Sequence, residues 1–116
     1  MQTLYEEKRK DSRLNISMPL RYQIRGTQES GNAVTKNLGP GGLSFIVEKF
    51  IKPETHIALD VNVFSKNINS IGTVRWAGSL PHSDRYQLGL EFVGLTLQDK
   101  KFISDYIKLR SHQENT

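Results

Sequence analysis

The chain has 116 residues, enough for one domain, and 36% of them are hydrophobic, enough for a single compact core. It contains no cysteine, which excludes disulfide bridges and thiolate metal sites. No apolar run approaches the ~20 residues of a membrane span, and the N-terminus is too polar for a signal peptide, so we expect a cytoplasmic protein without membrane insertion. The net charge of +4 favours an anionic partner.

The first segment of the chain, residues 1–15, has no regular hydrophobic period, and we expect it to form an arm. This arm is rich in cations, which are Lys8, Arg9, Lys10 and Arg13. Taken alone, such a run of mixed charges is typical of a solvated tail.

From about residue 16 the apolar residues recur with a period of two, which indicates half-buried strands. We expect strands over residues 18–25, 33–38, 43–48, 57–63, 71–77 and 86–92. Polar and turn-forming residues separate them, including a hairpin loop expected over residues 65–69.

After the last predicted strand the period changes to that of a helix. Thr96 and Asp99 have the spacing of a capping box, which predicts a helix start. Phe102, Ile103, Tyr106 and Ile107 follow as one apolar stripe. We expect the helix to end near Arg110 and a polar tail to cover residues 111–116. Six strands and one helix favour a small antiparallel barrel or sandwich over residues 16–110.

Two short motifs carry the functional information. The arm contains Arg9-Lys10-Asp11-Ser12-Arg13, and the turn before the third predicted strand is Asn37-Leu38-Gly39-Pro40-Gly41-Gly42. Together they resemble the two-part signature of the PilZ family, Arg-x-x-x-Arg followed by Asp/Asn-x-Ser-x-x-Gly. Gly39 stands where the family usually has serine. Further similarity lies in 20–22, 72–76 and 86–92, so the resemblance covers roughly residues 6–108 in the expected order.

The resemblance implies an all-β fold, a six-stranded antiparallel β-barrel with a C-terminal helix and a flexible N-terminal arm. It also implies a receptor for the bacterial second messenger cyclic di-GMP, held between the arm and the turn, and no cofactor besides this ligand. A receptor of this kind acts on an unidentified downstream protein, in motility or biofilm regulation. We expect a monomer or a weak dimer whose output is the ordering of the arm over the ligand.

Arginine suits this ligand because its planar fork pairs with phosphate or with guanine O6 and N7, and its flat face stacks on a base. We therefore expect Arg9 and Arg13 to bind cyclic di-GMP. Asn37 would accept a hydrogen bond from a guanine N–H, or bond its own backbone as a turn residue. Lys8 is a further candidate, because a basic residue there is associated in the family with two stacked ligand molecules, and Lys10 is another.

The turn glycines have several possible roles. Gly39 lacks the usual serine hydroxyl, and one net hydrogen bond is worth ~0.5–1.5 kcal/mol, or roughly three- to ten-fold in affinity. Gly42, with Gly41, would supply a positive φ, would let another backbone approach closely, or would serve the turn alone. Trp76 belongs either to the barrel core or to the border of the ligand site.

No enzyme constellation emerges, and we expect no catalytic activity and no metal site. The histidines, His56, His82 and His112, have no motif that ties them to a carboxylate and fit exposed loops. Two other functions remain open. One is a PilZ-like adaptor that has lost its ligand and binds only protein. The other is a small basic barrel for single-stranded nucleic acid, which the inward phase of most strand aromatics disfavours.

Overall fold

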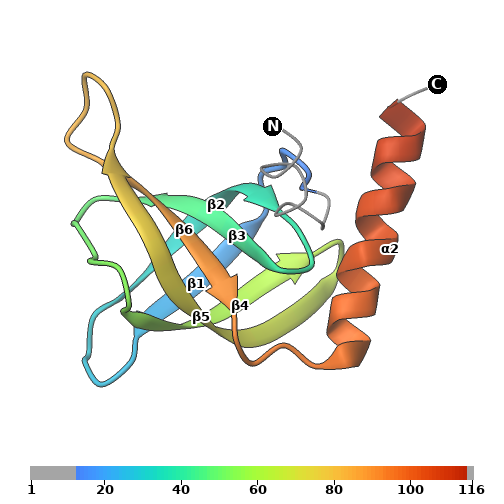
Figure 1. Ribbon diagram of the computed structural model, residues 1–116, viewed down its shortest axis with the longest axis horizontal. Helices are drawn as coiled ribbons and strands as arrows, with labels where there is room; N and C mark the ends of the chain where they lie inside the picture. The colour runs from blue at the N-terminus through green and yellow to red at the C-terminus, as the bar shows by residue number, and fades with distance from the viewer. Residues whose placement is uncertain (1–12, 115–116) are drawn as a thin grey trace, which may run out of the picture.

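The computed structural model describes residues 13–114, and for residues 112–114 the backbone only. Its elements are β1 (Pro19–Ile24), β2 (Ser30–Leu38), β3 (Gly42–Val47), β4 (His56–Val63), β5 (Lys66–Ser79), β6 (Tyr86–Phe92) and α2 (Leu97–Glu114). The strands pair in the order β1-β2-β3-β6-β5-β4, all antiparallel, and β4 pairs back to β1 to close the barrel (Figure 1). The predicted all-β fold with a C-terminal helix is confirmed.

The core lies inside the barrel and follows the period of two seen in the sequence. On β3, Leu43 and Phe45 are fully buried, and on β4 so are Ile57 and Val63. Inward residues of the other strands complete the core, among them Leu20, Leu38, Val74, Leu88 and Leu90. Because alternate residues of each strand face inward, the residues between them form the outer surface on which a ligand could bind.

Helix α2 runs beside the barrel and buries Ile103 and Ile107 against the core (Figure 1). One of the two hydrogen bonds of the predicted capping box is present, since the Asp99 backbone N–H donates to Thr96 Oγ1 at 3.1 Å. The Asp99 carboxylate instead forms an ion pair with Lys66 at 3.3 Å, which ties the helix to the start of β5. The helix continues to Glu114, so its predicted end near Arg110 was four residues too early.

The β4–β5 hairpin is tighter than the sequence indicated. The predicted loop over residues 65–69 is wrong, because β5 begins at Lys66, which pairs with Val63. Phe64 and Ser65 alone make the turn, with φ of 50° and 67°. Two-residue hairpin turns of this hand are usually Asn-Gly, so a Phe-Ser pair gives no recognisable signal.

The segment that precedes β1 packs along β2. Leu14 and Leu38 exchange two backbone hydrogen bonds of 2.9 Å, an isolated antiparallel bridge. The buried hydroxyl of Thr35 accepts from the Met18 N–H at 2.9 Å and donates to the carbonyl of Ile16. Leu14 and Met18 are each only 5% exposed, so this entry segment, residues 14–18, packs as part of the barrel.

Candidate ligand-binding site

The two sequence motifs meet where the chain enters the barrel. Arg13 Nη1 donates to Asn37 Oδ1 at 3.0 Å, across 24 residues of sequence. The Leu14–Leu38 bridge explains this contact: because it is antiparallel, Arg13 lies opposite Gly39, and Asn37 is its diagonal neighbour, within reach of the long arginine side chain. The last arginine of the arm and the asparagine of the turn therefore lie together at one corner of the outer surface.

A row of four residues crosses the outer surface from this corner. Asn37 on β2 is opposite Ser44 on β3, Ser44 is opposite Gly89 on β6, and Gly89 is opposite Trp76 on β5. Three interstrand spacings of ~4.8 Å make the row about 14 Å long. We call these four residues, together with Arg13, the cross-strand row. It has a guanidinium at one end and an indole at the other.

The two middle residues of the cross-strand row have no side chain that projects far from the sheet. Gly89 has no side chain, and Ser44 is 1% exposed although its neighbours Leu43 and Phe45 are the residues that face the core. The Ser44 hydroxyl accepts a hydrogen bond from Gln87 Nε2 at 3.3 Å. Ser44 and Gly89 thus separate a guanidinium suited to phosphate from an indole suited to stacking on flat rings.

Trp76 lies over Gly89. A Cβ atom at residue 89 would come within 2.1 Å of the indole Nε1 and 2.2 Å of Cε2. The indole thus occupies the space above the glycine, and yet Trp76 is 49% exposed. Of the two predicted places for Trp76, the core is therefore excluded, and the indole presents exposed ring surface suited to stacking.

A bulge in β5 explains why Trp76 faces outward. The pairing of β5 with β6 shifts register between Val74 and Trp76, so Arg75 is the extra residue. Strict alternation from the buried Val74 would place Trp76 inside the barrel. One inserted residue reverses the faces, which leaves both Arg75 and Trp76 on the outside.

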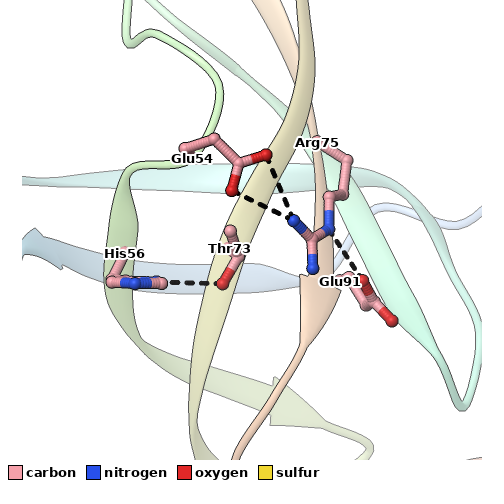
Figure 2. Close-up of polar contacts among 5 residues, drawn as sticks. All are labelled: Glu54, His56, Thr73, Arg75 and Glu91. Carbon is pink, nitrogen blue, oxygen red and sulfur yellow. Dashed lines mark hydrogen bonds and ion pairs between the residues drawn. The ribbon is translucent and has the colours of Figure 1, made fainter.

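Arg75 is a charged residue beside the row that sequence analysis missed. Its Nε donates to Glu91 Oε1 at 2.7 Å, and its Nη1 lies 3.3 Å from both carboxylate oxygens of Glu54 (Figure 2). The hydrogen bond to Glu91 is the main cause of a raised Arg75 pKa. No motif marks these residues, because they come from β5, β6 and the loop before β4. Nearby, His56 Nδ1 and Thr73 Oγ1 are 2.9 Å apart (Figure 2).

Gly42 acts through close approach, and none of the three turn glycines has a positive φ. A Cβ at Gly42 would lie 2.1 Å from the backbone oxygen of Leu90, so only glycine fits there. The Gly39 N–H donates to the Gly42 carbonyl at 2.8 Å, and the Gly41 carbonyl accepts from the Phe92 N–H at 2.9 Å. Among the described residues, Gly26 is the glycine with a positive φ. The Gly42 turn therefore fixes the contact between β3 and β6.

Other predicted site residues lie outside the described part. Lys8, Arg9 and Lys10 precede residue 13, so the structure does not place them. Within residues 13–114 there is no group of three histidine, aspartate or glutamate side chains that could hold a metal ion. His56 and His82 are exposed, as predicted, but His56 is the first residue of β4 and does not lie in a loop. In the same range, no helix has both the length and the apolarity that a membrane crossing requires.

Solved structures share this barrel. Bacillus subtilis inhibitor of motility, MotI/DgrA, superposes with a TM-score of 0.81 at 17% identity over 93% of this chain and 53% of that chain. The PilZ domain of Escherichia coli YcgR with c-di-GMP gives 0.70 at 10% identity, over 93% of this chain and 94% of that chain. The K. pneumonia MrkH–c-di-GMP complex gives 0.74 at 14% identity, over 93% of this chain and 55% of that chain.

This chain thus spans about half the length of MotI/DgrA and of MrkH. None of the curated proteins matches the sequence. The PilZ domain family model matches residues 7–109, which include the arm motif, all six strands and most of α2. The chain therefore belongs to the PilZ domain family.

Proposed function

We propose that this protein is a receptor for cyclic di-GMP that binds the ligand across the cross-strand row. The observation that carries the proposal is the 3.0 Å hydrogen bond between Arg13 and Asn37, since it joins the two motifs that the sequence associates with this ligand. Membership of the PilZ family supports it, as do the related barrels solved with c-di-GMP.

The chemistry of the row suits a ligand with two phosphates and two guanine bases. Arg13 offers a planar fork of N–H donors to a phosphate or to guanine O6 and N7. Trp76 offers exposed ring surface at the other end of the row, on which a purine stacks. Arg9, with Lys8 and Lys10, supplies further positive charge from the arm.

The proposed output is a change in the arm. When Arg9 and Arg13 bind the same ligand, residues 6–12 become ordered against the barrel and form a new surface for a downstream protein. Amide hydrogen exchange of residues 6–12, with and without ligand, tests this step. Unchanged exchange in a saturated complex would mean that the signal travels by another route.

Calorimetric titration with cyclic di-GMP tests the receptor function, with GMP and cyclic di-AMP as controls. We expect heat from cyclic di-GMP alone and loss of most of the affinity in Arg13→Ala. The sole tryptophan gives a second readout, because a stacked guanine quenches indole fluorescence. Absence of heat and of quenching at ~100 µM protein would refute a useful receptor site, since such a site has a Kd of micromolar or lower. It would favour a ligand-free protein adaptor.

A matched variant locates the site. Arg21 is an exposed arginine on β1, opposite Asp60 of β4 and away from the cross-strand row. Arg21→Ala removes the same charge as Arg13→Ala, and we expect it to leave affinity almost unchanged. Equal losses in the two variants would indicate that net charge, and not the site, attracts the ligand.

A further inference from the structure

The hydrogen bond between Arg13 and Asn37 suggests that the two side chains have different roles in the site. We propose that Asn37 is a positioning residue, whose carboxamide holds the Arg13 guanidinium in its ligand-binding place before any ligand arrives. This inference deepens the proposed function, because it assigns Asn37 an action on another side chain in place of the expected contact with a guanine N–H.

The polarity of the bond supports this role. A guanidinium has only donors, so the oxygen of the Asn37 carboxamide, and not its nitrogen, must face Arg13. That oxygen is the atom that the sequence assigned to the guanine N–H. Oδ1 uses one of its two lone pairs for Arg13, and the groups that Asn37 directs elsewhere include the two N–H donors of Nδ2. They match a phosphate oxygen or guanine O6 better than a guanine N–H.

Arg13 is attached to β2 both through its backbone and through its side chain. Its backbone adjoins Leu14, whose two 2.9 Å bonds to Leu38 attach it to β2. Its side chain is attached at the far end to Asn37, the neighbour of Leu38 on the same strand. Leu14 and Leu38 are 5% and 0% exposed, so the attachment is part of the barrel core. Folding therefore places Arg13 beside the turn.

This arrangement reduces the side-chain entropy that Arg13 loses when the ligand binds. Immobilising a free arginine side chain on binding would weaken affinity by about ten- to thirty-fold. Where folding has already restricted Arg13, much of that loss is avoided. Asn37→Ala should therefore weaken binding through Arg13, by about three- to ten-fold, the worth of one hydrogen bond.

A double-mutant cycle with cyclic di-GMP tests the coupling. We expect Asn37→Ala to weaken binding about three- to ten-fold in the parent protein, and by less than about two-fold in an Arg13→Ala background. Equal losses in both backgrounds would overturn the proposal, because they would show that Asn37 contacts the ligand independently of Arg13. Asn62→Ala is the matched control, since Asn62 also makes an exposed side-chain bond, 2.9 Å to Asn67.

A second measurement needs no ligand, and so separates this proposal from the receptor function. The NMR order parameter of the Arg13 Nε–H vector should fall in Asn37→Ala and remain high in Asn37→Asp, which keeps an acceptor oxygen. It should not change in Asn62→Ala. An Arg13 order parameter that is the same in the parent protein and in Asn37→Ala would overturn the positioning role, whether or not cyclic di-GMP binds.

Discussion

The indole of Trp76 fills the place that a side chain of Gly89 would take, on the opposite strand of the same pair. Two positions that look unrelated in the sequence are thus one structural unit. Glycine at residue 89 lets the indole lie close to the sheet, and the bulge at Arg75 turns it to the outer surface. A substitution at either residue therefore acts on the proposed stacking surface.

Gly89→Ala should displace the indole. Its Cβ would lie 2.1 Å from Trp76 Nε1, and overpacking of this kind costs about 1–3 kcal/mol. We expect a shift in tryptophan emission, a lower urea midpoint and weaker cyclic di-GMP binding. Gly78→Ala, on the strand that carries Trp76, is the control, because a Cβ there meets nothing within 4 Å. Identical emission spectra in the parent protein and Gly89→Ala would contradict the packing described.

Thr35→Val should loosen the entry segment. Valine has nearly the shape of threonine but cannot accept from the Met18 N–H or donate to the Ile16 carbonyl. Leaving buried polar groups without partners costs about 1–3 kcal/mol, measurable in urea unfolding. Thr73→Val should cost less, because the Thr73 hydroxyl bonds the exposed His56. A greater loss in Thr73→Val would show that the Thr35 hydroxyl does not hold the segment.

Tyr22 should make the fold sensitive to alkali. Burial, and then the negative charges of Glu29 and Glu48, raise the pKa of Tyr22 above 10.0. The folded state therefore holds the phenol proton more tightly, so this stabilisation is complete below pH ~10 and is lost as pH rises through the folded pKa. Tyr22→Phe keeps the ring packing on Phe45, at 5.4 Å between centroids, and removes the titrating group.

We therefore expect the free energy of unfolding to fall less steeply between pH 9 and 11 in Tyr22→Phe than in the parent protein, as measured by urea unfolding at each pH. Tyr106→Phe serves as control for the general effect of removing a phenol. Parallel curves for the parent and Tyr22→Phe would show that burial does not hold the Tyr22 proton.

Gly39→Ser restores the usual residue of the PilZ signature. The φ of Gly39 lies outside the left-handed region, so serine can adopt this backbone. One added hydrogen bond should strengthen cyclic di-GMP binding by up to about three- to ten-fold in calorimetry. Gly39→Ala is the matched control without a hydroxyl. If Gly39→Ser and Gly39→Ala both lose binding while remaining folded, the turn requires the absence of a side chain at residue 39.

The fold could be predicted because apolar and polar residues alternate strictly in most strands. On β3 and β4, the residues that this alternation assigns to the core are the ones that are buried. The errors arise where a single residue breaks a rule. The bulge at Arg75 reverses the phase and brings Trp76 outside, and no local pattern marks an inserted residue. The Phe64–Ser65 turn lacks the Asn-Gly signal, so the start of β5 was missed.

The candidate site was only partly predictable. Arg13 and Asn37 belong to motifs, and the structure brings them together. Arg75, Glu54 and Glu91 belong to none, because their contact depends on three separated segments of the closed barrel. A pairing of this kind follows from strand register, which cannot be inferred from a single sequence.

Closure of the barrel also sets the order in which the site can form. The β4–β5 hairpin closes over a two-residue turn. Its pairing therefore has the smallest entropic cost of loop closure and can form early. The cross-strand row requires β2, β3, β6 and β5 in register, with contacts from residue 13 to residue 89, and such long-range contacts form late. Unfinished chains on the ribosome, which lack β6, therefore cannot complete the cross-strand row.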